Sequence, residues 1–305
     1  MDKKYTVTIG IPAYNEAANI LNILDSILRQ KSTVFSLEKI IVACDGSTDG
    51  TPALVKSFSD QNPIVQVVSD EERLGKSGRM KQMIGLNQSD ILVFFDADVV
   101  LDTPLTVHHL IRPLEEKSVG LVGGSDVPFP GENFFQSLIV AAVDLWRYTR
   151  ETYNNGDTVH NSHGAILALR KAFADEAHMP TDQNGDDNFL YFRAKVLKYG
   201  FRYAPLAVVR HHEPKTPHDF ILQRSRFHDI KPSIVKNFGA WVNEYYAPLP
   251  WKYKLRGLFK ALLLKPFMTP LALIWEMSMH QYFEWKGYGV KPHGPTWEIV
   301  PSPRK

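Results

Sequence analysis

The sequence predicts an α/β fold in which a mostly parallel central sheet is flanked by helices and followed by a helical extension at the carboxyl end. Short apolar runs typical of strands alternate with segments whose apolar residues recur at helical spacing. Polar clusters follow several of these runs, where the strands of a parallel sheet would end. The 305 residues, 44% hydrophobic and 22% charged, suffice for one large domain or two ordinary ones.

The first half alternates strands and helices. Residues 5–11 alternate apolar and polar side chains, and residues 39–44 and 91–95 are continuous apolar runs typical of strands covered on both faces. Thr51 or Pro52 can open a helix after a cluster of turn residues. The expected strands are residues 5–11, 39–44, 64–68 and 91–95, and the expected helices are residues 15–30, a segment from Thr51 or Pro52, and residues 76–87.

The second half is less regular, and we expect it to extend the first half rather than fold independently. Its last predicted helix contains a proline, which removes a backbone donor and favours a break. The expected strands are residues 119–124, 165–169 and 201–209, and the expected helices are residues 134–151, 187–200 and 217–238, the last with a break near Pro232.

Composition excludes several classes of protein. The 35 Lys and Arg against 33 Asp and Glu give a net charge of +2, so no nucleic-acid partner is expected. The one cysteine, Cys44, permits no internal disulfide and no Cys-based zinc site, and indicates a reducing compartment. The first residues do not resemble a signal peptide, and no apolar run approaches the roughly 20 residues that cross a bilayer. We therefore expect a cytoplasmic protein.

Two aspartates on alternate residues, Asp96 and Asp98, follow the apolar run 91–95. Their charges would repel unless a cation or solvent lay between them, and Mg²⁺ or Mn²⁺ prefers carboxylate and phosphate oxygens. A metal that holds a diphosphate is one interpretation, and a solvated turn is the other. No glycine-rich phosphate loop follows the first strand. Lys76 and Arg79, at the start of a predicted helix, are therefore candidates to neutralise phosphate.

Short motifs along the chain point to one family. The motifs are Ile11-Pro-Ala-Tyr-Asn-Glu16, Cys44-Asp-Gly-Ser-Thr-Asp-Gly-Thr51, Gly75-Lys-Ser-Gly-Arg79, Phe95-Asp-Ala-Asp98, Gly164-Ala-Ile-Leu-Ala-Leu-Arg170, Gly185-Asp-Asp-Asn-Phe-Leu190 and Gln223-Arg-Ser-Arg-Phe227. Their order and spacing resemble those of family 2 glycosyltransferases over residues 5–240. The last motif is similar to the Gln-x-x-Arg-Trp motif of the synthase-like branch. The resemblance implies the GT-A fold, a Rossmann-like fold of nucleotide-diphospho-sugar transferases.

The resemblance implies a donor site built from the first half. Asp96 would lie near the ribose and the metal, and Asp98 would be the direct ligand of Mn²⁺ or Mg²⁺. Cys44 replaces the first Asp of the family's usual Asp-Asp-Gly-Ser, so part of the nucleotide contact would differ. The residues implied to bind the nucleotide base are Pro12, Tyr14, Glu16 and Asp45, and those implied to bind the diphosphate are Lys76 and Arg79.

The resemblance also implies an acceptor site. Asp187 would be the general base that deprotonates the acceptor hydroxyl. Asp186 replaces the family's Glu, which leaves open which of the two carboxylates is the base. Gln223, Arg224 and Arg226 would hold the leaving diphosphate or close the acceptor site, and Phe227 replaces the family's Trp.

A pair of histidines follows the predicted strand 201–209. Imidazole is a ligand of Mn²⁺-type sites, so His212 is a candidate to complete the metal shell. The alternative is a polar loop without a metal.

The implied activity is that of a metal-dependent, inverting hexosyltransferase. A UDP-sugar is the expected donor, and the acceptor hydroxyl would be lipid-linked or belong to a cell-surface glycan. One alternative is a sugar-1-phosphate nucleotidyltransferase, although such enzymes carry a glycine-rich basic loop where this chain has residues 12–16. Another alternative is an inactive GT-A binding subunit.

We expect a GT-A domain over residues 1–240, with a nucleotide-binding half of about 1–124 and an acceptor half of about 125–240, followed by an amphipathic extension over 241–305. In that extension apolar residues share one helical face, with Lys and Arg beside them. Residues 251–285 are predicted either to lie on the cytosolic face of a membrane or to cover the core. The apolar face consists of Leu255, Leu258, Phe259, Leu262 and Leu263.

Overall fold

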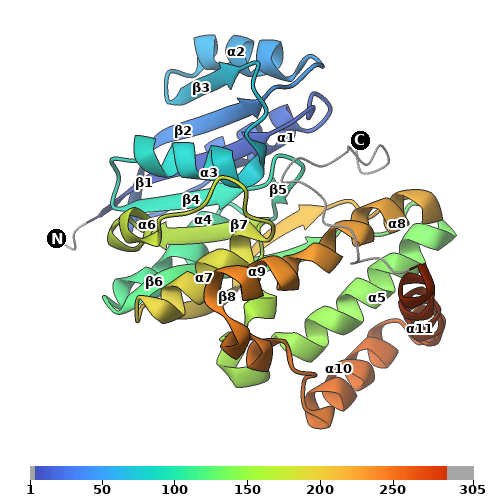
Figure 1. Cartoon of the computed structure of the whole chain (residues 1–305). Coiled ribbons are helices and arrows are strands. Elements are labelled where there is room, and N and C mark those ends of the chain that lie inside the picture. The colour runs from blue at the N-terminus through green and yellow to red at the C-terminus, as the bar shows by residue number, and fades with distance from the viewer. Residues whose placement is uncertain (1–3, 287–305) are drawn as a thin grey trace.

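The computed structural model describes residues 4–286, within which one curled eight-stranded sheet carries helices on both faces (Figure 1). The strand order is β3-β2-β1-β4-β7-β6-β8-β5. The strands are β1 Tyr5–Ala13, β2 Phe35–Asp45, β3 Val65–Asp70, β4 Ile91–Phe95, β5 Val100–Leu101, β6 Val119–Pro128, β7 Ile166–Arg170 and β8 Gly200–His211.

The helices begin and end close to most of the predicted segments. The α-helices are α1 Ile20–Leu28, α2 Thr51–Gln61, α3 Gly75–Leu86, α4 Thr106–Ile111, α5 Phe134–Arg150, α6 Lys171–Ala177, α7 Asp186–Val196, α8 Pro217–Ser225, α9 Ile230–Phe238, α10 Trp251–Leu264 and α11 Met268–Lys286. The short 3₁₀ segments are η1 Arg112–Glu115, η2 Tyr153–Gly156, η3 Val159–Asn161, η4 Arg226–Asp229 and η5 Ala240–Tyr246.

The first four strands form one parallel block of the sheet, and β6 and β8 also pair in parallel. β1 pairs in parallel with β2 and β4, and β2 pairs in parallel with β3. Alternate residues of β4 belong to different apolar clusters, with Val93 on the face covered by α1, α2 and α4, and Phe94 on the face covered by α3, α6 and α7. This double coverage is why β4 is a continuous apolar run. The predicted mostly parallel sheet flanked by helices is confirmed.

β7 joins the two halves of the chain. It lies between β4 and β6 and runs antiparallel to both. β5, from the first half, pairs with β8 from the second half. The two halves therefore share one sheet, and polar segments of the second half reach the edge where the first-half strands end.

The predicted helix 217–238 is divided, but not at Pro232. The 3₁₀ segment η4 separates α8 from α9, and Pro232 lies in the first turn of α9. A proline is tolerated there because the first turn of a helix leaves its backbone donors unpaired. The predicted helix 15–30 is shorter in the structure, where α1 begins at Ile20 and ends at Leu28.

The last two helices pack on α5 rather than on the sheet (Figure 1). α10 buries Gly257 and Ala261, and a side chain at Gly257 would collide with Thr149 of α5. Small residues thus let the two helices approach closely, while the larger apolar side chains of α10 point outward. Of the two alternatives given for this segment, the one in which its leucine face covers the core does not agree with the structure. The exposed large apolar side chains on α10, on α11 and between them are Trp251, Leu255, Phe259, Leu262, Leu263, Leu264, Phe267, Leu271, Ile274, Met277 and Trp285.

None of the helices between residues 4 and 286 is both long enough and apolar enough to span a membrane.

Candidate active site

The ends of β1 and β2 are joined by a polar loop contact. The backbone N–H of Asn15 donates to Ser47 Oγ at 3.0 Å, and the Asn15 side-chain oxygen accepts from the Thr48 N–H at 2.7 Å. Asn15 has a φ of 53°, a left-handed conformation that asparagine tolerates better than most residues. This turn keeps residues 14–19 out of the helix and places them beside the loop after β2.

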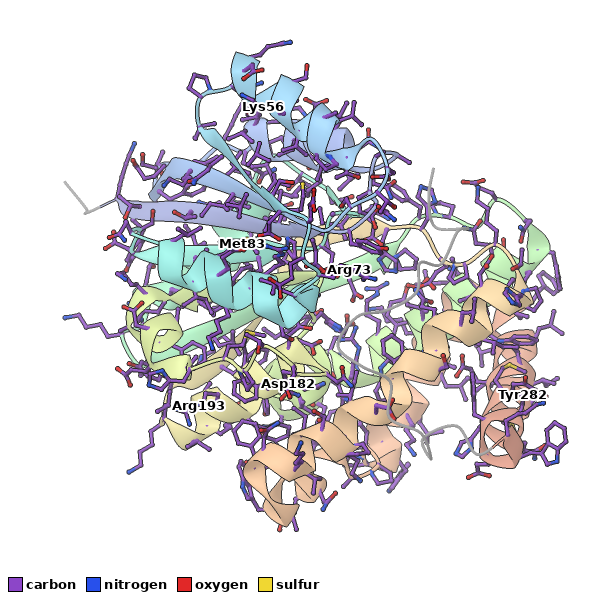
Figure 2. The ribbon with its side chains drawn as sticks, turned by 45° about the horizontal axis from the view of Figure 1, so that its top comes forward. Lys56, Arg73, Met83, Asp182, Arg193 and Tyr282 are labelled. Carbon is purple, nitrogen blue, oxygen red and sulfur yellow. The ribbon has the colours of Figure 1, made fainter. Side chains whose placement is uncertain are left out.

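Three predicted base-binding residues flank this loop. Pro12 lies in the last part of β1. The Tyr14 ring is covered by the guanidinium of Arg73, whose carbon lies 3.5 Å from the ring centroid; Arg73 is labelled in Figure 2. The Glu16 carboxylate accepts a 2.8 Å hydrogen bond from Asn19. Their placement at the ends of neighbouring strands is compatible with the predicted pocket.

Asp45, at the end of β2, holds the start of α3. Its carboxylate accepts hydrogen bonds from the N–H groups of Leu74 at 2.7 Å and Gly75 at 3.1 Å, and from Arg79 Nε at 2.9 Å. Asp45 is 4% exposed and Arg79 is fully buried. Each carboxylate oxygen can accept more than one hydrogen bond, so these contacts leave Asp45 able to accept another from a nucleotide base. That contact stays a prediction.

Arg79 does not face the candidate site as a phosphate ligand. Its remaining N–H groups donate to the Asp70 carboxylate, to Gln82 Oε1 and to the Glu72 carbonyl. All of its donors are therefore engaged by the protein. We correct the expectation for this residue: Arg79 orients Asp45 and the start of α3, and it does so from within the core.

Lys76 connects the donor and acceptor halves. Its Nζ lies 2.7 Å from Asp96 Oδ1 and 3.5 Å from Asp186 Oδ2, and it donates to the Gly164 carbonyl at 3.3 Å. Burial lowers the pKa of Lys76, but the carboxylates of Asp186 and Asp96 outweigh this and hold it above its ordinary value. Lys76 is thus a permanent cation between acidic groups of β4 and α7.

The two aspartates after β4 differ in environment. Asp96 is partly buried beside Lys76, whereas Asp98 is exposed and the intervening Ala97 is buried. Burial raises the pKa of Asp96 to about 6. The charge of Lys76 lowers this pKa, and the charge of Asp98 raises it and partly offsets the effect of Lys76. A divalent cation would relieve this repulsion. The carboxylate of Asp98 is the more accessible ligand.

The Asp187 carboxylate is held by two backbone hydrogen bonds. It lies in the first turn of α7, where its Oδ2 accepts from the Gly164 N–H at 3.1 Å and its Oδ1 from the Asn188 N–H at 2.7 Å. Burial, and then the charge of Asp186, raises the pKa of the Asp187 carboxyl to about 7. Asp186 instead faces Lys76. This difference favours Asp187 over Asp186 as the base.

The two candidate histidines point to different partners. His212 stacks on Phe129 with centroids 4.7 Å apart, and its Nδ1 lies 3.7 Å from a Glu132 oxygen. His211 lies 3.0 Å from Glu213; burial lowers its pKa, but Glu213 and the more distant Asp126 and Asp98 together raise it to about 9.

Between residues 4 and 286, no three His, Cys, Asp or Glu side chains are grouped closely enough to hold a metal. The geometry thus gives no support to His212 as a third ligand beside Asp96 and Asp98. The charge of Asp98 raises the pKa of His211. The order of the two histidines in the sequence does not show which of them lies nearer Asp98.

The predicted diphosphate residues of the last motif lie in and after α8. Gln223 and Arg224 belong to α8, and Arg224 lies over the Phe220 and Phe227 rings with its Nη2 4.0 Å from Glu276 of α11. The side chain of Arg226 lies outside the described part of the structure. Their roles stay predictions.

The sequence analysis missed a half-buried polar group at the end of β6. Asp126 lies 3.3 Å from Arg150 of α5 and 3.6 Å from His163, the residue before Gly164. Burial and the charge of Arg150 lower the pKa of His163 to about 3, so its ring is neutral. The one available signal was the position of Asp126 after an apolar strand.

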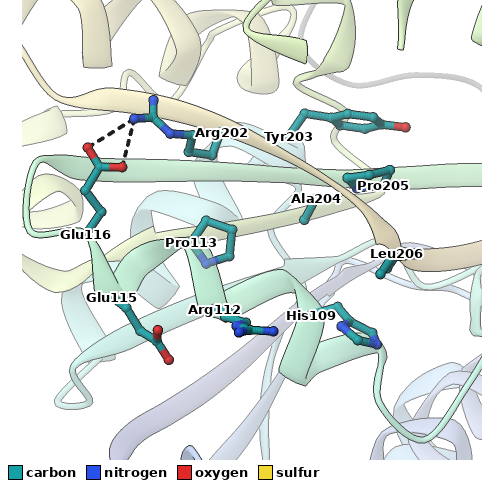
Figure 3. A pocket seen from close by; sticks show the side chains of 10 residues that line it. All are labelled: His109, Arg112, Pro113, Glu115, Glu116, Arg202, Tyr203, Ala204, Pro205 and Leu206. Carbon is teal, nitrogen blue, oxygen red and sulfur yellow. Dashed lines mark hydrogen bonds and ion pairs between the residues drawn. The ribbon is translucent and has the colours of Figure 1, made fainter. Parts of the chain in front are cut away.

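A surface depression of about 470 Å³ lies elsewhere, against η1 and the first part of β8 (Figure 3). Its lining includes Arg112, Leu206 and the ion pair between Arg202 and Glu116, whose closest atoms are 2.8 Å apart. It contains none of the candidate residues, and it is therefore not the donor site.

Comparison with known proteins identifies a matching family and similar proteins. Residues 8–176 match the model of a family described as glycosyl transferase family 2. Over 234 residues the chain is 23% identical to poly-beta-1,6-N-acetyl-D-glucosamine synthase of Staphylococcus aureus strain COL, covering 74% of this chain and 55% of that protein. Over 221 residues it is 29% identical to glycosyltransferase AglD of Haloferax volcanii, covering 66% of this chain and 32% of that protein. The chain spans little more than half of the first relative.

Solved structures share the fold. The mannosyltransferase PcManGT of Pyrobaculum calidifontis, in complex with GDP-Man and Mn²⁺, matches with a TM-score of 0.61 at 22% identity, over 94% of this chain and 83% of that one. Glucosyl-3-phosphoglycerate synthase of Mycobacterium tuberculosis, in complex with Mn²⁺, UDP and phosphoglyceric acid, matches with a TM-score of 0.53 at 21% identity, over 76% and 78%. The expected GT-A fold is confirmed.

The buried guanidinium of Arg79 provides a stability test. We expect Arg79→Met to lower the free energy of unfolding by about 3–5 kcal/mol, because it removes the buried cation of Asp45 and leaves only the half-exposed Arg73, at 3.9 Å, near that carboxylate. Arg202→Met is the matched control, since the exposed Arg202–Glu116 pair contributes about 0–1 kcal/mol. Urea denaturation measures both. Equal, small losses in the two variants would contradict the structural role given to Arg79.

Proposed function

The chain belongs to glycosyltransferase family 2, and from this premise we propose that it transfers a sugar from a nucleotide-diphospho-sugar to an acceptor hydroxyl, with inversion at the anomeric carbon. The observation that carries the proposal is the acidic cluster around Lys76, which brings Asp96, after β4, close to Asp186 at the start of α7, the residue before the raised-pKa carboxyl of Asp187. Metal-binding and proton-accepting groups thus lie on neighbouring elements.

A divalent metal fits the donor side of this cluster. Asp96 and Asp98 offer hard oxygen ligands, and the pKa of Asp96 is raised by burial and then by the charge of Asp98, a repulsion that a cation would offset. We propose that Asp98 holds Mn²⁺ or Mg²⁺ and that Asp96, already paired with Lys76, binds near the ribose. The metal would supply charge stabilisation for the departing diphosphate. Lys76 adds a second positive charge from the protein itself.

The proton of the acceptor hydroxyl is proposed to pass to Asp187. The acceptor oxygen then forms a bond to the anomeric carbon as the bond from that carbon to the diphosphate oxygen breaks, and the electron pair of the broken bond leaves with the nucleoside diphosphate. The Gly164 and Asn188 N–H groups fix the Asp187 carboxylate in one orientation. A pKa near 7 suits a base that must accept a proton at neutral pH.

The donor nucleotide is proposed to be UDP. The structural relatives named above bind UDP or GDP-Man, so GDP-mannose is the other donor to compare. The acceptor is proposed to be a hydroxyl of a lipid-linked sugar or of a surface glycan, in one or a few transfers.

The outward apolar side chains of α10 and α11 support a peripheral membrane position on the cytosolic side. Lys252, Lys254 and Arg256 are exposed on α10 among the apolar side chains. Aromatic and leucine side chains enter the acyl boundary, and cations nearby attract anionic headgroups. We propose that this surface, the α10–α11 face, rests on anionic lipid and brings the enzyme to a lipid-linked acceptor.

A donor screen tests the metal site. We expect UDP with Mn²⁺ to raise the thermal midpoint, since a ligand at 100 times its Kd stabilises the folded state by about 2.7 kcal/mol. Asp98→Ala should abolish the part of this rise that depends on Mn²⁺. The control Asp60→Ala removes an exposed carboxylate on α2 and should leave the response intact. A metal response that survives in Asp98→Ala would remove Asp98 as the ligand.

The proposed base predicts a pH profile. Only the deprotonated carboxylate accepts a proton, so kcat/KM should rise with pH through about 7 and then level off. Asp187→Asn should keep donor binding and lose transfer by about 10²–10⁴-fold. Asp182→Asn, an exposed neighbour labelled in Figure 2, is the control. Normal turnover in Asp187→Asn, with loss in Asp186→Asn, would assign the base to Asp186.

Vesicle flotation tests the α10–α11 face. Leu255→Glu combined with Phe259→Glu should lower binding to phosphatidylglycerol-rich vesicles by more than about tenfold, because burial of each apolar side chain contributes about 1.5–3 kcal/mol. The control is Leu105→Glu combined with Leu206→Glu, two exposed leucines elsewhere. Equal flotation of both variants would contradict membrane binding, and a concentration-dependent dimer that the first variant abolishes would assign the surface to a second copy.

A further inference from the structure

Tyr246 is a residue outside the family match and outside the motifs. It ends η5, the segment that leads from α9 into α10. Its hydroxyl oxygen is buried and has no hydrogen-bond partner among the described residues. A buried hydroxyl without a partner costs free energy, and a hydrogen bond from a ligand or water removes that cost.

The surroundings of Tyr246 place it at the acceptor side. Its ring contacts Phe192 of α7, with centroids 5.8 Å apart, and His160 of η3, with centroids 6.2 Å apart. These same two segments meet at Asp187, because Ser162 Oγ donates to the Asp187 carbonyl at 3.0 Å and the Gly164 N–H donates to its carboxylate. Tyr246 therefore packs against both segments that position the proposed base.

Electrostatics agree with this placement. Burial, and then the charge of Asp187, raises the pKa of the Tyr246 hydroxyl above its ordinary value. The Nζ of Lys231, on α9, lies 5.7 Å from the centroid of the Tyr246 ring, a cation–π contact that helps to hold the ring in place. The hydroxyl is thus neutral at physiological pH and able to donate or accept a hydrogen bond.

Resting on the proposed function, we infer that Tyr246 is an acceptor-binding residue that the extension supplies to the site: its hydroxyl hydrogen-bonds a hydroxyl of the acceptor sugar while Asp187 takes the proton of the reacting one. A polyhydroxylated acceptor satisfies the unpartnered Oη, whereas a water molecule acting as acceptor uses Asp187 alone. Acceptor recognition and the proposed membrane face then belong to one continuous segment, from η5 into α10.

The test compares Tyr246→Phe with Tyr245→Phe, an exposed tyrosine of the same segment. The probes are n-octyl glycosides as acceptors and UDP-sugar hydrolysis as the reaction with water. Tyr246→Phe should raise the KM for the glycoside about threefold to tenfold, the effect of one hydrogen bond between neutral groups. Donor KM, hydrolysis rate and the pH profile should stay unchanged, and Tyr245→Phe should resemble the wild type.

Stability without acceptor gives a second readout that needs no activity. Removal of an unpaired buried hydroxyl should leave the thermal midpoint of Tyr246→Phe equal to or above that of the wild type. A lowered midpoint would mean that the protein itself satisfies the hydroxyl, and would overturn the inference. An unchanged glycoside KM would also overturn it, as would an equal change in hydrolysis and transfer, which would show an effect on Asp187 alone. Absence of hydrolysis and transfer in the wild type would instead overturn the proposed function.

Discussion

The ammonium group of Lys76 is the interaction on which the rest of the site depends. It lies between the carboxylates of Asp96, after β4, and Asp186, at the start of α7, which are 90 residues apart in sequence. Without a cation there, burial of several carboxylates in one place would be strongly unfavourable. Lys76 lies in the first turn of α3, and the contacts of Asp45 with Arg79 and with the first N–H groups of the helix fix where α3 begins. A core contact thereby sets the geometry of the acidic cluster.

Local pattern predicted the parallel part of the fold well, because each strand there is a short apolar run covered on both faces. β4 begins and ends at the predicted residues. Pattern could not predict that β7 enters the sheet antiparallel between β4 and β6, since strand direction depends on the path of the connections. It left two alternatives open for α10, where Gly257 and Ala261 make the close contact and the leucines face outward, because periodicity finds an apolar stripe without indicating what covers it.

For the site, motif order predicted which segments meet, but not which donors are already used. Arg79 carries the charge expected of a phosphate ligand, yet its donors are consumed in the core. Spacing does not distinguish His211 from His212; in the structure His211 pairs with Glu213, whereas the His212 ring packs on Phe129. Tyr246 has no motif at all, because a hydroxyl left without a partner is a property of the folded chain.

The lone thiol of the chain has a consequence for work on the isolated protein. Cys44 is fully buried in β2, directly before Asp45, and burial raises its pKa to about 11. The nucleophilic thiolate is therefore scarce at neutral pH, and alkylating reagents reach the sulfur only when the strand separates from its neighbours. Labelling kinetics at this single position would consequently report opening of the sheet beside the nucleotide loop, without any introduced probe.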